Sequence, residues 1–102
     1  MSTRVDVVGN IYLLHFERPY LHAGHYLGWT EGPIQERIAR HVSGHGSPLV
    51  ACVVRLGIKV LLSRSWFNVT RKKERSLKNI GGLRRQCPIC KEQEFLKTVA
   101  WG

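Results

Sequence analysis

The sequence predicts a small α+β domain in which a three-stranded, mainly antiparallel sheet is flanked by helices. Two short β-prone apolar runs, at residues 11–16 and 25–30, are joined by a short connection with Pro19 and Gly24 at its ends. A connection this short favours an antiparallel pair. Two helical patterns, a third apolar run at residues 58–66 and a last helical segment follow. The order β-β-α-α-β-α is typical of one sheet packed on helices.

The first predicted helix begins with polar residues and carries an apolar stripe. Thr30 or Glu31 can accept hydrogen bonds from its free backbone amides, and Pro33 fits its first turn, where a missing N–H is tolerated. Apolar side chains recur every four residues from Ile34 to Val42. This spacing marks the face that we expect to be buried.

The two later helices have similar start and stop signals. Ser47 is expected to cap a second helix, which Gly57 ends. Asn68 or Thr70 is expected to cap the last helix, which covers about residues 70–78. The third strand, between these helices, is rich in Val, Leu and Ile.

Length and composition indicate one domain. A chain of 102 residues with 43% hydrophobic residues buries a modest core and is not a disordered tail. We expect a core over residues 1–82 and a C-terminal tail over residues 83–102, packed on the core or partly flexible. No apolar run approaches the roughly 18–20 residues that cross a bilayer, and the N-terminus lacks the apolar centre of a secretion signal. With an odd count of three cysteines, we expect a cytoplasmic, bacterial-type protein with no membrane partner.

Basic residues outnumber acidic ones. The chain has 16 Lys and Arg against 7 Asp and Glu, a formal net charge of +9 and a sequence pI of about 10.1. Such an excess makes a polyanion the leading partner. Seven of the basic residues and a single acid, Glu74, lie within residues 71–85. We expect this segment to bind the backbone of DNA, with RNA as an open alternative, through contacts that are salt-sensitive and independent of base sequence.

Two phenols and one guanidinium form a candidate site for a phosphate ester. Tyr12 and Tyr26 lie on neighbouring predicted strands, which can bring both phenols together. Arg37 and His41 share one helix face, one turn apart. The alternative interpretation is that the tyrosines are ordinary half-buried strand aromatics. Gly28, which lets another group approach the backbone closely, favours the functional interpretation.

The segments Asn10-Ile11-Tyr12 and Tyr26-Leu27-Gly28 resemble the two signature tripeptides of the GIY-YIG nuclease superfamily. The resemblance continues in order over residues 10–80. In that family an arginine follows in the first helix, where this chain has Arg37, and a histidine one turn further on corresponds to His41. A glutamate of the last core helix holds a divalent metal, and Glu74 is the matching position. Asn10 and Leu27 depart from the Gly and Ile of the family pattern.

The resemblance implies a metal-dependent endonuclease that hydrolyses phosphodiester bonds in DNA, by nicking or by structure-selective cleavage. In this role Arg37 binds the phosphoryl oxygens, and Tyr12 is the candidate general base, with Tyr26 or His41 positioning water or sharing that role. Glu74 holds one Mg²⁺ or Mn²⁺ ion. The alternative for Glu74 is a surface ion pair with Lys78.

The same resemblance defines the expected partners. The residues expected to contact nucleic acid are basic, apart from one glycine: Gly28, Arg40, Arg71, Lys72, Lys73 and Lys78. We expect a monomer or a transient homodimer. The competing function is a non-catalytic, basic nucleic-acid-binding module on the same scaffold.

Cys87 and Cys90 have the spacing of a zinc knuckle. A structural zinc needs four ligands, and the sequence has no second CxxC or HxxxH motif. Cys52 lies on a helix face that is predicted to be buried. We therefore expect a reduced cysteine pair in a tight turn, with zinc as the alternative if histidines from far along the chain or a second subunit complete the site. His15 is interpreted as a residue of the first strand's face and His25 as a residue that flanks the loop.

Overall fold

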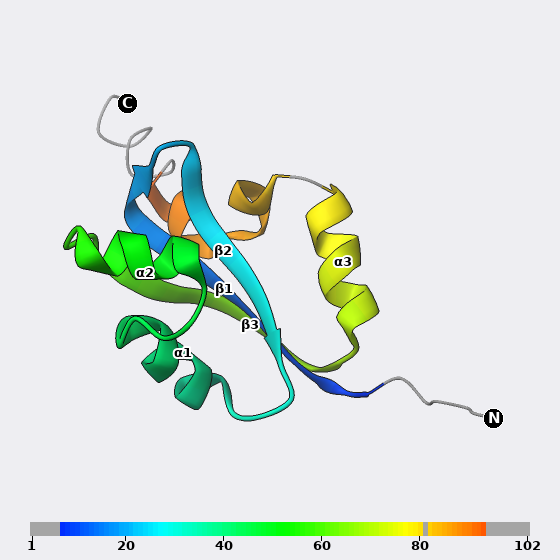
Figure 1. Ribbon diagram of the computed structural model, residues 1–102. Helices are drawn as coiled ribbons and strands as arrows, with labels where there is room; N and C mark the ends of the chain where they lie inside the picture. Colours follow the sequence, from blue (N-terminus) through cyan, green and yellow to red (C-terminus); the bar gives the residue numbers. More distant parts are fainter. Residues whose placement is uncertain (1–6, 81, 94–102) are drawn as a thin grey trace.

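The computed structural model describes residues 7–80 and 82–93, and the predicted α+β fold is confirmed. Three antiparallel strands form one sheet in the order β2-β1-β3, so that β1 is central (Figure 1). The strands are β1 (Gly9–Tyr20), β2 (Ala23–Thr30) and β3 (Val60–Val69). The helices are α1 (Ile34–Val42), α2 (Pro48–Arg55), α3 (Arg71–Ile80) and the short 3₁₀ helix η1 (Leu83–Gln86), and a further helical segment covers residues 88–93.

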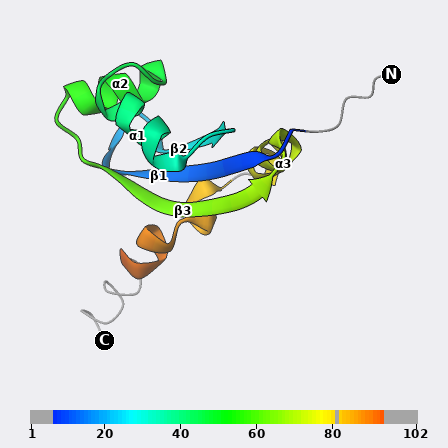
Figure 2. The ribbon, with the colours of Figure 1, turned by 90° about the horizontal axis from the view of Figure 1, so that it is seen from below.

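The central strand is buried on both faces. Every residue from Ile11 to Phe16 is at most 5% exposed. Because successive side chains of a strand point to opposite faces, this run contributes side chains to two separate hydrophobic cores. Figure 2 shows α1 and α2 on one face of the sheet and the C-terminal segment that begins with η1 on the other.

Each face has its own hydrophobic cluster. The buried members on the α1 and α2 face are Tyr12, Leu14, Phe16, Ile34, Val50, Val53 and Ile58. Those on the opposite face are Ile11, Leu13, Leu27, Trp29, Leu77 and Cys87. Leu83, Ile89 and Cys90 pack against this second cluster. The described part of the C-terminal tail is therefore packed on the core, while residues 94–102 lie outside the described residues.

The first strand is longer than predicted. We expected it to end at Phe16 with a loop over residues 20–24, but β1 runs to Tyr20 and only a two-residue turn precedes β2. The β1–β2 register shifts between His15 and Tyr20. Proline is tolerated in a strand at such an irregularity, where no ladder hydrogen bond from its nitrogen is required. Pro19 therefore marks a local irregularity and not the end of the strand.

The helix starts are partly as predicted. The Ser47 cap of α2 is confirmed, because its hydroxyl accepts a hydrogen bond from the Leu49 N–H at 3.2 Å. The expected cap of α1 was wrong: Pro33 occupies the N-cap position, and the Thr30 hydroxyl accepts instead from the Gly32 N–H at 3.2 Å. That contact closes a local turn before the helix begins.

The third strand forms one edge of the sheet and lies slightly later than the predicted residues 58–66. Ile58 is part of the first core, and pairing continues to Val69, just after Asn68 takes a left-handed φ of 57°. Several apolar side chains of this edge strand remain exposed, namely Leu61, Leu62 and Phe67.

The exposure pattern predicts that two leucines of neighbouring strands differ sharply in their contribution to the free energy of unfolding. Leu13 is 0% exposed, and Leu13→Ala should lower the free energy of unfolding by about 2–5 kcal/mol because it leaves a cavity in the second core. Leu62 is 46% exposed, and Leu62→Ala should change it by less than about 1 kcal/mol. Denaturant unfolding of both variants tests this, and similar values would contradict the packing.

Candidate functional site

The two signature tyrosines lie together on the α1 and α2 face of the sheet. Tyr12 pairs with Gly28 across the β1–β2 ladder, and Tyr26 lies diagonally opposite on the same face. The two phenol rings have centroids 6.3 Å apart. Tyr12 is only 1% exposed, and its hydroxyl lies 2.8 Å from Nε2 of His41. The His41 ring also packs edge-on against Tyr26, with centroids 5.2 Å apart.

The hydrogen bonds of His41 fix its tautomer. The backbone N–H of Ser47 donates to Nδ1 at 3.2 Å, so Nδ1 carries the lone pair. Burial, and then the charges of Arg37 and Arg40, lower the pKa of His41, which keeps the ring neutral at pH 7. Nε2 then carries the only ring proton and donates it to the Tyr12 oxygen.

The environment of Tyr12 brings the predicted catalytic residues into one neighbourhood. Burial raises the pKa of Tyr12 to about 12, and the Tyr26 phenol and the Glu74 carboxylate act in the same direction. The Arg37 guanidinium beside the phenol acts in the opposite direction. Groups from β1, β2, α1 and α3 therefore lie within electrostatic reach of a single oxygen.

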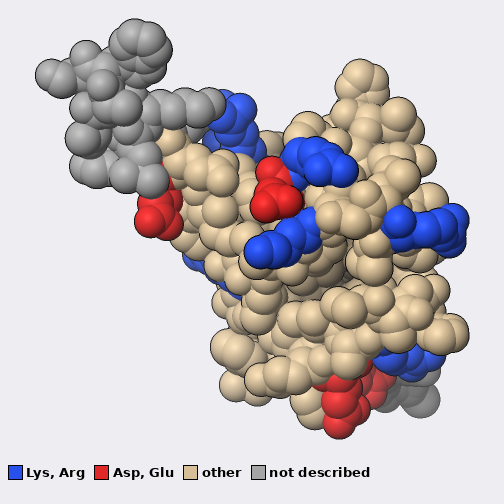
Figure 3. Space-filling model, turned by 90° about the vertical axis from the view of Figure 1, so that its left-hand side faces the viewer, with Lys and Arg blue, Asp and Glu red and all other residues tan. Residues whose placement is uncertain are grey.

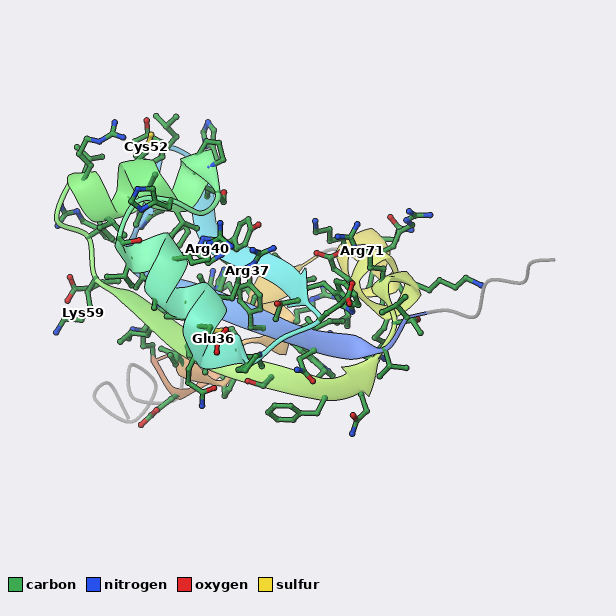
Figure 4. The ribbon with its side chains drawn as sticks, turned by 60° about the horizontal axis from the view of Figure 1, so that its bottom comes forward. Glu36, Arg37, Arg40, Cys52, Lys59 and Arg71 are labelled. Carbon is green, nitrogen blue, oxygen red and sulfur yellow. The ribbon has the colours of Figure 1, made fainter. Side chains whose placement is uncertain are left out.

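The arginines of α1 extend toward this neighbourhood. Figure 4 shows Arg37 and Arg40 projecting from α1 toward β2 and α3, whereas Glu36 of the same helix points elsewhere. Arg37 is partly buried and Arg40 is exposed. Arg37 is thus the arginine that is held at the phenols, and Arg40 adds charge at the rim.

The surface ion pair expected as the alternative for Glu74 is present, and its role as a metal ligand stays a prediction. Its carboxylate forms the i, i+4 ion pair with Lys78, with Oε2 and Nζ 3.6 Å apart. The Glu74 side chain is nevertheless only 20% exposed, against 56% for Lys78. Its charge reaches Tyr12, as described above. The surface ion pair therefore exists, and it does not separate the carboxylate from the phenol cluster.

Gly28 has a clear packing role. A Cβ at this position would lie 2.3 Å from both Cζ and the hydroxyl of Tyr12, much closer than atoms in contact allow. Gly28 is also buried. The glycine therefore leaves room for the phenol to lie across the neighbouring strand, and its predicted contact with nucleic acid stays a prediction.

Asn10 connects three segments through its side chain. Its amide nitrogen donates to the Gly32 carbonyl at 3.2 Å, and its oxygen accepts from the Asn68 N–H at 3.4 Å. The preceding Gly9 is the residue in close contact, since a Cβ there would lie 2.4 Å from the Thr30 carbonyl oxygen. The side chain of Asn10 thus helps to hold the ends of β1, β2 and β3.

The basic residues that were predicted to contact nucleic acid differ in their surroundings. The Arg71 guanidinium lies over the Trp29 ring, 4.9 Å from its centroid, and Lys78 pairs with Glu74. Lys72 and Lys73 are exposed on α3. On the face shown in Figure 3, Lys and Arg form separate groups interspersed with carboxylates and no continuous basic patch.

A second group of reactive side chains lies at the opposite face of the sheet. His15 and His25 face each other across β1 and β2, and Cys87 and Cys90 reach them from the C-terminal tail. One donor atom from each residue lies within 4.8 Å of all the others. Burial lowers the pKa of His15, and burial, His15 and Arg84 lower that of His25. These four residues form a His₂Cys₂ cluster that can hold a metal ion.

This cluster corrects the sequence-based interpretation of its members. Cys87 and Cys90 were expected to form an isolated reduced pair, with a zinc site lacking two of its ligands. His15, interpreted from the sequence as a strand-face residue, and His25, interpreted as a residue that flanks the loop, lie beside the two cysteines and could supply the two further ligands. Cys52, on α2, is not part of the cluster and is partly buried. A cross-strand histidine pair in a predicted hairpin was the signal that could have identified the cluster.

Comparison with protein-family models, with curated proteins and with solved structures found no match to this chain. Within residues 7–80 and 82–93, no helix is long and apolar enough to cross a membrane.

The close approach at Gly28 predicts a position-specific effect of alanine. Gly28→Ala should displace the Tyr12 phenol from His41 and lower the free energy of unfolding by about 1–3 kcal/mol, because the added methyl group overpacks a filled site. Gly24→Ala is the matched control. Gly24 lies on the same strand, and no atom lies within 4 Å of a Cβ built there. Denaturant unfolding of the two variants measures the difference, and equal stabilities would contradict the packing of Tyr12 on Gly28.

The raised pKa of Tyr12 predicts a loss of stability at alkaline pH. The unfolded chain releases the phenol proton near pH 10 and the folded chain only near pH 12. The contribution of Tyr12 is therefore fully present below pH 10 and is lost as the pH rises to 12, by about 2–3 kcal/mol in total. Comparing the free energy of unfolding of the wild type and Tyr12→Phe from pH 8 to 11.5 isolates the contribution of the Tyr12 phenol. Parallel curves for the two proteins would show that the phenol does not titrate as described.

Proposed function

We propose that this protein is a metal-dependent endonuclease of the GIY-YIG type, which hydrolyses phosphodiester bonds in DNA by nicking or structure-selective cleavage. One observation carries the proposal, the shared neighbourhood of five side chains that are far apart in the sequence: Tyr12, Tyr26, Arg37, His41 and Glu74. An ordinary pair of strand aromatics does not require an arginine and a neutral histidine beside the same phenol, with a carboxylate close enough to influence its pKa.

Tyr12, once it has released its own proton to solvent and become a phenolate, is the residue that accepts the proton of the attacking water. Its pKa of about 12 keeps the phenol protonated in the resting protein, so this role requires stabilisation of the phenolate. His41 supplies part of it, because its Nε2–H donates to the phenol oxygen. The positive charge of Arg37 acts in the same sense. Tyr26 packs against both Tyr12 and His41 and is a positioning residue for them.

Arg37 is the phosphate-binding group of the site. Its planar guanidinium can donate two parallel hydrogen bonds to phosphoryl oxygens, and charge builds on these oxygens as the water attacks. Its location beside Tyr12 brings the bound phosphate close to the general base. Burial, and then the Arg37 charge, lower the pKa of His41 and thereby keep that ring a neutral donor.

Glu74 fits the requirements for a Mg²⁺ or Mn²⁺ ligand. It supplies a hard carboxylate oxygen that is partly exposed, and such ions are often held by one or two carboxylates together with waters and substrate phosphates. When bound, the ion supplies Lewis-acid stabilisation of the developing charge on the leaving oxygen. Lys78 balances the carboxylate charge when no cation is near.

The partner and setting follow from the charge. A net charge of +9 and the exposed α3 residues Arg71, Lys72 and Lys73 suit the phosphate backbone of DNA, with RNA as a second substrate to be tested. Each chain has one such site, so a monomer would nick and a transient homodimer would cut both strands. A cytoplasmic location is part of this proposal.

The proposal predicts cleavage that depends on Arg37 and Glu74. The wild type should cut supercoiled, single-stranded or branched DNA in Mg²⁺ or Mn²⁺, and Arg37→Ala or Glu74→Gln should lower the rate by about 10²-fold or more. Glu36→Gln is the matched control, because Glu36 is exposed on α1 and points away from the site. Binding of the same DNA should persist in Glu74→Gln, with RNA assayed alongside.

Two outcomes would contradict the enzymatic assignment. Binding without cleavage in any divalent metal indicates the competing function, a non-catalytic nucleic-acid-binding module. Cleavage that Glu74→Gln and Glu36→Gln affect equally would remove Glu74 from the site.

A further inference from the structure

We propose that His15, His25, Cys87 and Cys90 bind one structural Zn²⁺ ion that fastens the C-terminal tail to the sheet. This site is separate from the phenol cluster and does not depend on the proposed nuclease function.

The spacing of the four donor atoms is that of a tetrahedral zinc site. Zn–N bonds of about 2.0–2.1 Å and Zn–S bonds of about 2.3 Å separate two nitrogens by about 3.4 Å and a nitrogen from a sulfur by about 3.6 Å in a regular tetrahedron. Here His15 Nδ1 and His25 Nε2 are 3.4 Å apart. Three of the four nitrogen–sulfur pairs have similar separations: His15 with Cys87 (3.4 Å), His15 with Cys90 (3.6 Å) and His25 with Cys90 (3.3 Å). All four donor atoms lie within 4.8 Å of one another.

Hydrogen bonding does not account for this arrangement. Nδ1 of His15 lies 3.4–3.6 Å from three donor atoms at once, those of His25, Cys87 and Cys90. An imidazole nitrogen has either one proton or one lone pair, so it can satisfy one of these neighbours and not all three. A cation at the centre satisfies the four ligands together, since each directs a lone pair at it.

The donor set selects zinc over the ion assigned to Glu74. Thiolate and imidazole ligands in a tetrahedral S₂N₂ arrangement favour zinc, whereas Mg²⁺ and Mn²⁺ prefer carboxylate, carbonyl and water oxygens. Four protein ligands also leave no open position for a water or a substrate, which is the mark of a structural and not a catalytic site.

Neighbouring groups support the thiolates. The Cys90 backbone N–H donates to the Cys87 sulfur at 3.4 Å, and the Ser63 hydroxyl lies 3.0 Å from the same sulfur. Partners of this kind orient metal ligands and stabilise their charge. Cys87 is fully buried, so a thiolate there needs such compensation.

The position of the cluster explains what the ion does. His15 and His25 belong to β1 and β2, and Ser63 belongs to β3. The two cysteines belong to the tail and pack in the second core together with Leu83 and Ile89. The ion therefore joins the tail to the sheet, on the opposite face from Tyr12. Because the site does not exist in the unfolded chain, the free energy of zinc binding stabilises the fold.

Metal analysis of the full-length protein tests this site. The wild type is purified under reducing conditions and incubated with ZnSO₄ before desalting. Inductively coupled plasma mass spectrometry should then find about one zinc per chain. Substitution with Co²⁺ should give the intense visible bands of a tetrahedral thiolate site. Chelation should lower Tm by more than about 10 °C, and added zinc should restore it.

The variants assign the ligands. Cys87→Ser, Cys90→Ser and His25→Ala should each lose stoichiometric zinc, and chelation should no longer change their Tm. Cys52→Ser is the matched control and should keep both the zinc and the effect of chelation, because Cys52 lies on α2 outside the cluster. If a ligand variant fails to fold, the zinc content and Co²⁺ spectrum of the wild type still decide the question.

The proposal is overturned if the reduced wild type binds no stoichiometric zinc or cobalt, or if Cys87→Ser retains the metal. A Cys87–Cys90 disulfide in the protein isolated without reductant, together with no metal uptake after reduction, would identify a redox pair instead. Glu74→Gln should retain its zinc. Loss of cleavage with zinc retained, or the reverse, separates the failure of one proposal from the failure of the other.

Discussion

The burial of β1 on both faces is the constraint on which the rest of the structure depends. A strand covered on both sides has no face for solvent, so each residue from Ile11 to Phe16 must suit one of two interiors. Two of them, Tyr12 and His15, carry polar atoms, and a buried polar atom needs a partner. Tyr12 finds His41, and His15 finds the cysteine and histidine donors on the other face. Both candidate sites are thus built around the polar members of one central strand.

The turn between α1 and α2 helps to orient the phenol cluster. Ser47 caps α2 with its hydroxyl, and its backbone N–H fixes the tautomer of His41. Gly46, beside it, is in close contact with the His41 ring, since a Cβ there would lie 2.1 Å from Nδ1. The turn between α1 and α2 therefore sets both the start of a helix and the direction in which His41 donates. The orientation of the site is a property of this turn as much as of the strands.

Much of the fold was predictable because its signals are local. The apolar runs, the Ser47 cap and the stripe of α1 each depend on a few adjacent residues, and so does the placement of Arg37 and His41 on one helix face. The His₂Cys₂ cluster was not predicted because it depends on register. His15 faces His25 only in one alignment of β1 with β2, and a slip of one residue moves a side chain to the other face. Pro19 suggested from the sequence that the first strand ends early, so the predicted connection was longer than the two-residue turn in the structure. The register that pairs His15 with His25 was therefore not predicted.

The exposed edge of β3 has a consequence for the behaviour of the protein in solution. An edge strand with Leu61, Leu62 and Phe67 partly open to water can pair with the same edge of another copy. Mutual repulsion between chains of charge +9 opposes that encounter. Anything that neutralises this charge, whether concentrated salt or a bound polyanion, removes the opposition. Colloidal stability and polyanion binding are therefore linked in this chain through the same surplus of lysine and arginine.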